Sequence, residues 1–355
     1  MEASNKRIAF VIGSMGNGGA ERVVSIIAND YAQQGWHVDI LMLLSNECTY
    51  KIESGVTLID LSGNKSSRIA RLPFWLKNIR DYALTKKPDI VVSFVARINI
   101  ITQLALKHLN IPIVVSERND PYKDGRGAIV DFMTKRLYPK ATAVVFQTKR
   151  AQGYFPTLNN ACIISNPIEI HSERKDALRT RMVTVGRLSE QKNHKMLIEA
   201  FSQFHKRHPE YILDIYGEGH LRDSLQQLIS ELNMGECVTL KGNVPDIHSQ
   251  IADAKLFVLS SDYEGLSNAL LEAMTLGIPC ISTNCAGSDE YIQHGENGLL
   301  VDVGNTSAMV EAMEYMVTHI DEANEMGNCA QRMSQSFAKP NVIKQWDKVI
   351  NASID

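Results

Sequence analysis

Hydrophobic residues follow two alternating patterns along this chain. Short runs of aliphatic and β-branched residues are each followed by longer stretches in which apolar residues recur every three or four positions. Short apolar runs are typical of buried strands, and the longer period is typical of helices. The alternation continues through almost the whole chain, which predicts parallel α/β sheets with helices on both faces.

The predicted strands fall into two series. The first series covers residues 8–13, 37–43, 56–61, 89–95, 112–117 and 143–148. The second covers residues 182–186, 211–217, 237–242, 255–261, 278–283 and 298–303. A polar stretch at 166–180 separates them and is predicted to be a linker. We predict two Rossmann-like domains facing across a cleft, at 1–165 and 181–335, and a closing helix at 336–355.

Length and composition agree with this division. The chain has 355 residues, of which 44% are hydrophobic and 22% charged, and this suits two soluble globular domains. It contains no apolar run near the roughly 20 residues that cross a bilayer and no N-terminal signal peptide, so we expect a cytoplasmic protein. Its six cysteines are scattered without metal-type pairing, which predicts reduced thiols and no metal site.

The two halves differ in charge. Residues 1–165 hold 21 lysines and arginines against 13 acidic residues, whereas residues 166–355 hold 16 against 27. A basic first half favours an anionic partner such as phosphate or a lipid surface, although drift between two domains would also produce the difference. The basic and aromatic segment 68–87 could lie on an anionic membrane, or it could be an amphipathic helix packed on the first sheet.

Two acids near residue 270 are candidates for ligand binding. Glu264 and Gly265 follow the apolar run 255–261, and Ser267 can cap a helix that starts near Asn268, carries Glu272 and stops at Gly277. Ligands of open α/β sheets bind at the carboxyl ends of the strands. The two carboxylates there would suit a sugar joined to a ribose; the alternative is that both are ordinary surface charges.

Two cations leave the same edge of the second sheet. Arg187 and Lys192 lie in the segment GRLSEQKN, which starts at Gly186 directly after a predicted strand and precedes a helix. Arginine by a forked contact and lysine by a compact charge would suit a diphosphate. Solvated surface charges are the alternative, although cations at a helix start oppose the helix dipole.

Glycine-rich turns follow several predicted strands. They are GSMGNGGAER, which contains Gly18 and Gly19, YGEGHLRDSL, which contains Gly217, and the small-residue loop that starts at Cys285 and is predicted to open a short helix. Glycine lets backbone amides approach an anion, but each turn could also be simple strand–helix punctuation. The first turn lacks the G-x-G-x-x-G spacing of dinucleotide enzymes, which argues against a nicotinamide oxidoreductase.

The order and spacing of these stretches resemble the retaining glycosyltransferases of family 4, which have the two-domain B-type glycosyltransferase fold. The resemblance runs from GGAER at 18–22 to the C-terminal helices and is most specific between Gly186 and Val301. It implies a nucleotide-sugar donor in the second domain and a final helix near Trp346 that crosses back to the first domain.

The resemblance also implies a role for each matching residue. Arg187 and Lys192 would neutralise the diphosphate, Glu264 would hold hydroxyls of the transferred sugar, and Glu272 would hold the ribose. Amides around Leu266 and Ser267 would face phosphate, and Gly18 and Gly19 would approach it from the first domain. The complete set of implied donor-binding residues is Gly18, Gly19, Gly186, Arg187, Lys192, Gly217, Glu264, Gly265, Leu266, Ser267 and Glu272, with Arg187, Lys192 and Glu264 as the catalytic ones.

One position departs from the family pattern. Many relatives place a histidine after the fifth strand of the first domain, where this chain has SERNDP with Arg118. Glu117, Arg118 and Asn119 are therefore candidates for the acceptor side. The chain also has no Asp-x-Asp triplet, so cations of the protein would replace a metal at the leaving group.

The resulting hypothesis is a retaining, metal-independent hexosyltransferase. Its donor would be a UDP-linked hexose or N-acetylhexosamine, and its acceptor a glycan or lipid-linked oligosaccharide of a bacterial surface. It would need no cofactor, bind no nucleic acid and work on the inner face of the cytoplasmic membrane. The alternatives are a sugar-nucleotide epimerase of similar fold and a protein that binds a nucleotide sugar without turnover.

Overall fold

The computed structural model divides the chain into two α/β units. It describes residues 6–16, 18–63, 68–169, 180–244, 246–285 and 287–354. Unit 1 consists of Met1–Pro167 and Pro340–Asp355, and unit 2 of Ile168–Lys339. Most of the predicted linker, residues 170–179, lies outside the described residues. Ile168 does not belong to a linker, because its backbone pairs with Phe337 and Lys339 within unit 2.

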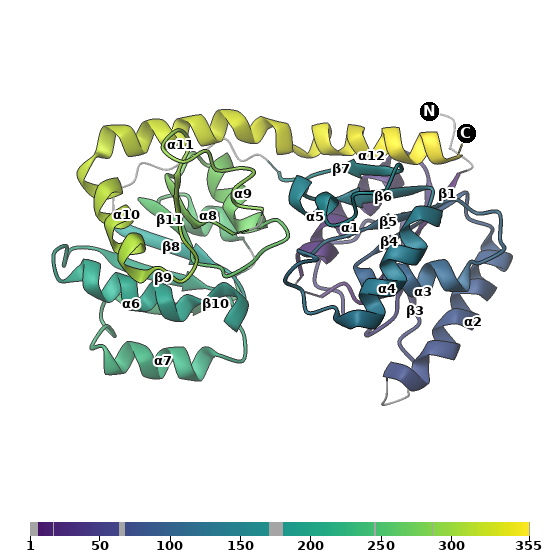
Figure 1. Ribbon diagram of the computed structural model, residues 1–355, viewed down its shortest axis with the longest axis horizontal. Helices are drawn as coiled ribbons and strands as arrows, with labels where there is room; N and C mark the ends of the chain where they lie inside the picture. Colours follow the sequence, from purple (N-terminus) through teal and green to yellow (C-terminus); the bar gives the residue numbers. More distant parts are fainter. Residues whose placement is uncertain are drawn as a thin grey trace. The chain divides into compact units, whose positions relative to one another are not determined.

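Unit 1 is a parallel sheet covered by helices on both faces (Figure 1). Its strand order within the described residues is β3-β2-β1-β4-β5-β6-β7. The strands are β1 (Arg7–Ile12), β2 (His37–Met42), β3 (Val56–Asp60), β4 (Ile90–Phe94), β5 (Ile113–Ser116), β6 (Ala143–Phe146) and β7 (Ala161–Ile163). The helices are α1 (Gly19–Gln33), α2 (Arg68–Lys86), α3 (Ala96–Ala105), α4 (Gly127–Leu137), α5 (Lys149–Gly153) and α12 (Lys339–Ile354), with the 3₁₀ turn η1 at Tyr138–Lys140.

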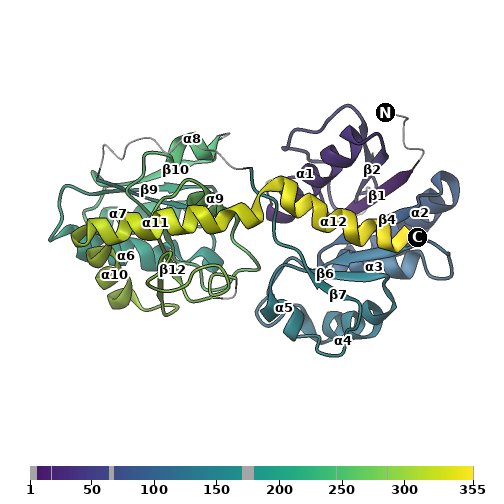
Figure 2. The same ribbon diagram turned by 90° about the horizontal axis from the view of Figure 1, so that it is seen from above.

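The alternation of β1 explains why apolar side chains pack on both faces of the sheet of unit 1. Ile8, Phe10 and Ile12 point to one face, where they pack against α1 and α12. Ala9 and Val11 point to the other face, where they pack against α2 and α3. Neighbouring side chains of a strand face opposite ways, so a central strand covered on both faces is apolar at every position. Figure 2 shows α12 lying along the sheet of this unit.

The basic segment 68–87 forms α2 and packs on the sheet. Trp75, Ile79 and Ala83 are buried one turn apart, in the same core as strand residues of β1 and β2. The apolar stripe of this helix is therefore occupied inside unit 1. This favours the packed amphipathic helix over membrane attachment through that stripe.

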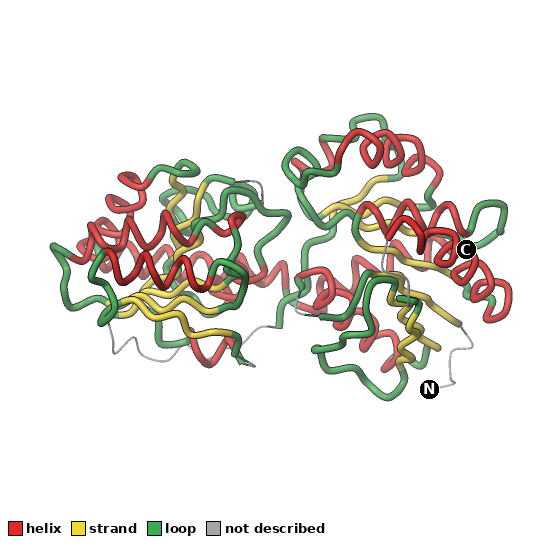
Figure 3. Tube along the Cα trace, turned by 90° about the horizontal axis from the view of Figure 1, so that it is seen from below, coloured by secondary structure: helices red, strands yellow, loops and turns green. Residues whose placement is uncertain are grey.

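Unit 2 has the same architecture (Figure 3). Its described strands follow the order β10-β9-β8-β11-β12-β13, all parallel. The strands are β8 (Arg181–Val185), β9 (Ile212–Tyr216), β10 (Val238–Gly242), β11 (Leu256–Leu259), β12 (Cys280–Thr283) and β13 (Leu299–Val301). The helices are α6 (His194–His205), α7 (Arg222–Glu231), α8 (Ile247–Ile251), α9 (Asn268–Thr275), α10 (Thr306–Thr318) and α11 (Ile320–Ser334), with 3₁₀ turns η2 at Glu190–Lys192 and η3 at Gln335–Phe337.

The helices of unit 2 also lie on both faces of the sheet. α6, α7 and α10 share one core with alternate residues of β8 and β9, and α8 and α9 share the other with β11. In the described part of the chain, no helix combines the length and the apolarity needed to cross a bilayer. The sheet order reverses between β8 and β11, and this switch point locates the ligand-binding edge.

Candidate functional site

The loops that follow β8 and β11 meet at the carboxyl edge of the second sheet. The two strands are hydrogen-bonded neighbours, so residues 186–193 and 260–267 leave the sheet side by side. The predicted cations Arg187 and Lys192 lie in the first loop and the predicted acid Glu264 in the second. The switch point of the sheet thus brings together residues that are more than 70 positions apart in sequence.

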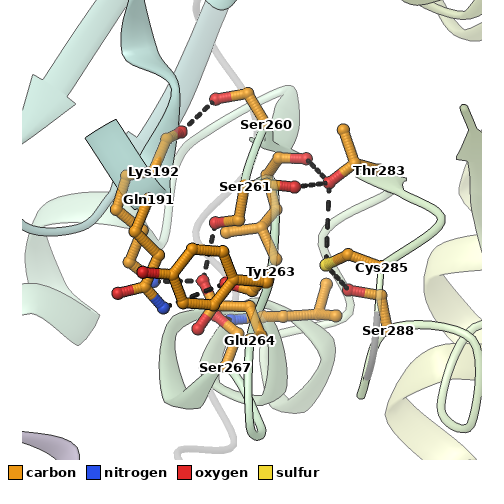
Figure 4. Close-up of polar contacts among 12 residues, drawn as sticks. Gln191, Lys192, Ser260, Ser261, Tyr263, Glu264, Ser267, Thr283, Cys285 and Ser288 are labelled. Atoms are coloured by element: carbon orange, nitrogen blue, oxygen red, sulfur yellow. Dashed lines mark hydrogen bonds and ion pairs between the residues drawn. The ribbon is translucent and has the colours of Figure 1, made fainter. Parts of the chain in front are cut away.

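Lys192 and Glu264 form an ion pair at this edge (Figure 4). The ammonium contacts Oε1 of Glu264, and the hydroxyl of Ser261 donates to the same oxygen over 2.6 Å. Only 7% of the Glu264 side chain and 16% of the Lys192 side chain are exposed. Among the described residues, no hydrogen bond reaches Oε2 of Glu264. The pair therefore fixes the carboxylate and leaves one oxygen for another partner.

The backbone around Lys192 is held by the neighbouring strand end. The hydroxyl of Ser260 donates to the Lys192 carbonyl over 2.8 Å. The Lys192 stem crosses Gly186 so closely that a Cβ there would lie 3.1 Å from two of its carbons. Lys192 is the last residue of η2 and lies two positions before the start of α6, in the segment that is predicted to precede this helix. Asn193 adopts a left-handed conformation and caps α6 through the Met196 amide.

Arg187 differs from Lys192 in both exposure and pairing. Its side chain is exposed, and no acidic partner contacts its guanidinium in the described part of the chain. A guanidinium that remains unpaired beside a paired lysine leaves the edge with positive charge. Its fork of donors is suited to a dianionic group such as a diphosphate.

Glycines allow the loops of this edge to approach one another. A Cβ on Gly217 would clash with the carbonyl of Gly186, and one on Gly287 would lie 2.4 Å from the carbonyl oxygen of Gly265. Gly217 and Gly287 also have positive φ angles, of +133° and +86°. Only glycine meets both requirements without strain. Gly217 and Gly287 are therefore required for the packing of the loops, independently of any contact with a ligand.

Helix α9 begins where the sequence pattern places it. Ser267 caps it by accepting from the Leu270 amide over 3.4 Å, and Gly277 follows its end with φ of +68°. Ser267 and Leu266 are both buried, and their amides donate no hydrogen bond to an acceptor in the described residues. Free amides beside a helix N-terminus form a favourable environment for an anion.

Glu272 lies deeper in the unit than a surface charge. It is 2% exposed, on the second turn of α9. Its Oε1 lies 3.7 Å from Nε2 of His248 in α8, whereas Glu264 pairs with Lys192. The two acids therefore have different partners, and both are too buried for the interpretation that they are ordinary surface charges.

The small-residue loop after β12 lies against this site. The hydroxyl of Thr283 donates to the Ser261 carbonyl over 2.5 Å, and Ser282 donates to Ser288 over 2.8 Å. Burial raises the pKa of the Cys285 thiol, and the nearby Glu264 charge adds to the rise. The prediction of a short helix after this loop is wrong, because residues 287–291 form turns. Gly287 in these turns leaves room for the backbone of Gly265.

In unit 1, Gly18 and Gly19 start α1 at the carboxyl edge of β1. Gly18 is the N-cap residue, and the carboxylate of Glu21 lies so close that a Cβ on Gly18 would clash with it. Gly19 is exposed. An acid in the first turn already complements the helix dipole, so this end is less suited to a phosphate than the turn alone suggested.

The three acceptor-side candidates differ in exposure. Glu117 is fully buried and takes a 2.8 Å hydrogen bond from Tyr138. Burial raises the pKa of its carboxyl, which Arg126 approaches at 3.3 Å. Glu117 is thus a buried, hydrogen-bonded side chain of unit 1 and is not accessible to a sugar acceptor. Asn119 is the exposed member of the three.

Arg118 is held inside unit 1 by aromatic rings. Only 6% of the residue is exposed, and its guanidinium lies 5.1 Å from the ring centre of Phe94 and 5.6 Å from that of Trp346. Its Nη1 donates to Asn166 over 3.0 Å. Burial lowers the pKa of Arg118 to about 9. The contacts with the two rings stabilise the guanidinium cation in this buried position, in place of an ion pair with an acidic partner among the described residues.

Sequence reasoning missed the side chains that hold the site together. The sequence pattern places Ser260 and Ser261 at the end of a strand, and the structure shows that they orient Lys192 and Glu264. Two hydroxyls directly at a strand end were the only available indication. Gly287 was seen as part of an anion-accepting loop, but its contact with Gly265 depends on tertiary structure.

Comparison with known proteins agrees with this geometry. The chain matches the family described as "Glycosyltransferase Family 4" over residues 17–171 and "Glycosyl transferases group 1" over residues 166–333. It is 27% identical, over 96% of its own length and 98% of the relative's, to a Campylobacter jejuni N-acetylgalactosaminyltransferase named for a diphospho-undecaprenol-linked acceptor.

Solved structures show the same fold. Sucrose-phosphate synthase from Thermosynechococcus elongatus superposes with a TM-score of 0.85 at 18% identity, covering 98% of this chain and 99% of that one. Anabaena HepE, solved with UDP and glucose, superposes with a TM-score of 0.83 at 19% identity, covering 98% and 100%. The predicted fold class, two Rossmann-like units of the B-type glycosyltransferase fold, is confirmed.

The fold and the two matching families define the protein as a glycosyltransferase. More closely, the chain belongs to glycosyltransferase family 4, which confirms the resemblance. The comparisons do not favour the epimerase or the non-catalytic binding protein.

Proposed function

We propose that the protein transfers a hexose or N-acetylhexosamine, with retention of configuration, from a UDP-linked donor to a glycan or lipid-linked oligosaccharide during assembly of a bacterial surface glycan. The observation that carries the proposal is the Lys192–Glu264 pair at the switch point of unit 2, beside Arg187, which has no acidic partner among the described residues. The named acceptor of the Campylobacter jejuni relative and the UDP bound to HepE support the choice of substrates.

Each group at the edge has a task in this proposal. Arg187 takes the diphosphate by a forked contact, and Lys192 adds a second positive charge as the leaving group departs. Glu264, held by Ser261, offers Oε2 to hydroxyls of the transferred sugar. The amides of Leu266 and Ser267 face a phosphate oxygen, and Glu272 holds the ribose.

We propose further that these cations make a divalent metal unnecessary. Among the described residues, no cluster of three or more histidine, cysteine or acidic side chains is suited to hold a metal ion. Transfer measured with and without EDTA tests this proposal. Equal rates support it, and a rate that is lost with EDTA and restored by Mg²⁺ or Mn²⁺ overturns it.

The donor, the acceptor and the stereochemistry are tested together. UDP-sugars are screened against lipid-linked and free glycan acceptors, and products are identified by mass spectrometry. The anomeric configuration of the new linkage is then read by NMR. A product with the donor's own anomeric configuration supports retention, and an inverted one overturns it. Incubation with the donor alone distinguishes a transferase from a sugar-nucleotide epimerase, because an epimerase converts the donor without any acceptor.

Substitutions at the two predicted contacts have different expected effects. Arg187→Ala should lower turnover about 10²- to 10³-fold, because it removes charge that stabilises the departing diphosphate. Glu272→Ala should mainly weaken nucleotide binding, measured by calorimetry with UDP. Arg207→Ala is the matched control, since its side chain is 60% exposed after α6. Unchanged kinetics and binding in both site variants would refute the assignment.

Transfer to a lipid-linked acceptor takes place at a membrane surface, because the lipid holds the acceptor there. We propose that the protein acts peripherally on the inner face of the cytoplasmic membrane. The excess of basic residues in the first half of the chain supports this location, since anionic lipids attract such a surface.

A further inference from the structure

Helix α4 has an apolar face that the described residues of unit 1 leave exposed. Ile129 is 80% exposed and Phe132 is 66% exposed, the two highest values among the large apolar side chains of the described residues. They are three positions apart and so lie on the same side of the helix. Of the residues of α4, only Thr134 is buried. Apolar side chains this exposed and this close together mark an interaction surface.

Three exposed basic residues with no acidic partner among the described residues lie in α4 or within four positions of its ends. Arg136 is one turn beyond Phe132, Lys123 precedes the helix and Lys140 follows it, and all three are exposed. None of them has an acidic partner in the described part of the chain. Ile129 and Phe132, with Lys123, Arg136 and Lys140, are called the α4 face below.

The acidic residues nearby are already neutralised. Asp131 accepts from Lys135 over 2.9 Å and from Tyr154 over 2.7 Å. Asp124 pairs with Arg126 at 2.8 Å. The charge that remains around the α4 face is therefore positive, which complements an anionic surface.

Aromatic rings also lie beside α4, because the Tyr154 hydroxyl donates to Asp131 of this helix. Tyr122 is 51% exposed, its ring meets that of Tyr154 edge-on at 4.7 Å, and the Arg150 guanidinium lies 5.0 Å from its centre. Tyrosine rings and long cationic side chains are enriched where protein meets the lipid headgroups, because one end is apolar and the other polar. Exposed apolar residues on a helix that has tyrosine rings and cations near it suit a surface that docks on a bilayer.

The α4 face also lies next to the acceptor side in sequence and in the fold. α4 follows the loop after β5, which carries the exposed Asn119 at the carboxyl edge of the first sheet. We propose that the α4 face docks unit 1 on an anionic lipid bilayer, with Ile129 and Phe132 entering the headgroup region. This inference deepens the proposed function, on which it rests for the nature of the acceptor.

Vesicle binding tests the α4 face directly. Full-length protein should co-sediment with vesicles of phosphatidylcholine mixed with an equal amount of phosphatidylglycerol, and less with phosphatidylcholine alone. Ile129→Ser with Phe132→Ser should weaken the partition coefficient about tenfold or more. Arg136→Glu should reduce it mainly at low salt. Ile320→Ser, 46% exposed in unit 2, is the matched control. Undiminished binding of the double variant would overturn the proposal.

A fluorescence measurement distinguishes α4 from α2. The three native tryptophans, Trp36, Trp75 and Trp346, are all buried. A tryptophan introduced by Phe132→Trp is therefore the exposed one, and brominated lipids should quench it while its emission shifts to the blue. Leu84→Trp, at a position 52% exposed on α2, should remain unquenched. Quenching of the α2 variant alone would overturn the proposal.

Two further outcomes separate this inference from the proposed function. The double variant should transfer sugar to a water-soluble acceptor at the normal rate and lose activity only on acceptors held in vesicles. Normal transfer with intact vesicle binding would refute the docking surface and leave the enzyme assignment standing. Vesicle binding that depends on the α4 face, with no transfer to any acceptor, would refute only the enzyme assignment.

The oligomeric state gives a further test of the α4 face. If the double variant changes the oligomeric state in light scattering and leaves vesicle binding unchanged, a second copy of the chain covers the face, and the proposal is overturned.

Discussion

At the scale of single residues, the charge of the site depends on the ion pair between Lys192 and Glu264. The sequence suggests one cation for phosphate and one acid for sugar, acting apart. In the structure they contact each other, so each holds the side chain of its partner in position and balances its charge. Arg187 supplies the remaining positive charge because it has no acidic partner among the described residues.

The pair can be tested by a double-mutant cycle. Lys192→Met leaves a 7% exposed carboxylate without its cation, so we expect the free energy of unfolding to fall by about 1–3 kcal/mol and turnover to fall about 10²-fold. Adding Glu264→Gln should restore most of the stability, since the amide is neutral, but not the turnover. Denaturant unfolding and initial rates measure the two quantities. Full recovery of turnover in the double variant would contradict the proposed role of the pair.

His194 gives a pH-dependent prediction at the same scale. It is 3% exposed at the start of α6, and burial, with a contribution from Lys192, lowers its pKa to about 4. The unfolded chain, with an ordinary histidine pKa near 6.5, binds the proton first, so stability should fall as the pH drops from about 6.5 towards 4. We expect a loss of about 2 kcal/mol between pH 7.5 and pH 5.

Urea unfolding of the wild type and of His194→Gln at both pH values isolates this contribution. The variant should lose that much less stability on acidification. His220→Gln is the control, because its side chain is 63% exposed. Parallel pH profiles of the wild type and the His194 variant would contradict the prediction.

At the scale of elements, strand ends and helix starts were the most predictable features. Ser267, Asn268 and Gly277 bound α9 because a cap and a left-handed glycine act locally. The sequence predicts a helix where residues 287–291 form turns, because the conformation of this loop depends on its approach to Gly265. Local signals fix where an element starts, whereas contacts between loops fix irregular structure.

This close approach gives a prediction about loop packing. Gly287→Ala places a methyl group against the Gly265 carbonyl at a φ of +86°, so we expect stability to fall by roughly 2 kcal/mol or more and transfer to slow. Gly235→Ala is the matched control, because open space surrounds that position. Calorimetric unfolding and donor kinetics measure both effects. Equal effects of the two substitutions would mean that the loop contact is unimportant.

At the scale of the whole molecule, the C-terminal helix α12 belongs to unit 1, whose other residues come from the N-terminal part of the chain. Trp346 is fully buried, with Val342 and Ile350 beside it, in the core formed by α1 and one face of the first sheet. Its ring lies 6.0 Å from that of Phe94. Unit 1 is therefore not a continuous stretch of sequence, and its core is complete only when residues 340–355 are present.

Trp346→Ala tests this dependence. A cavity of that size should lower the stability of unit 1 by about 3–5 kcal/mol. Hydrogen exchange followed by peptide should show lost protection in β1, β4 and α1, with unit 2 unchanged. Lys344→Ala, at an exposed position of the same helix, should have no comparable effect. Equal loss of protection in both units would indicate that α12 does not stabilise unit 1 selectively.

The sequence by itself determined the two α/β series, the strand and helix order, and the family, because burial patterns and glycine turns depend on near neighbours. It also singled out Arg187, Lys192, Glu264 and Glu272 as the residues of interest. Only the tertiary structure decided that Lys192 and Glu264 pair and that Glu117 is buried inside unit 1. It also decided that Ile129 and Phe132 of α4 are the most exposed large apolar side chains of the described residues. The physical reason is that pairing and exposure depend on which distant segments meet, and no local pattern records that.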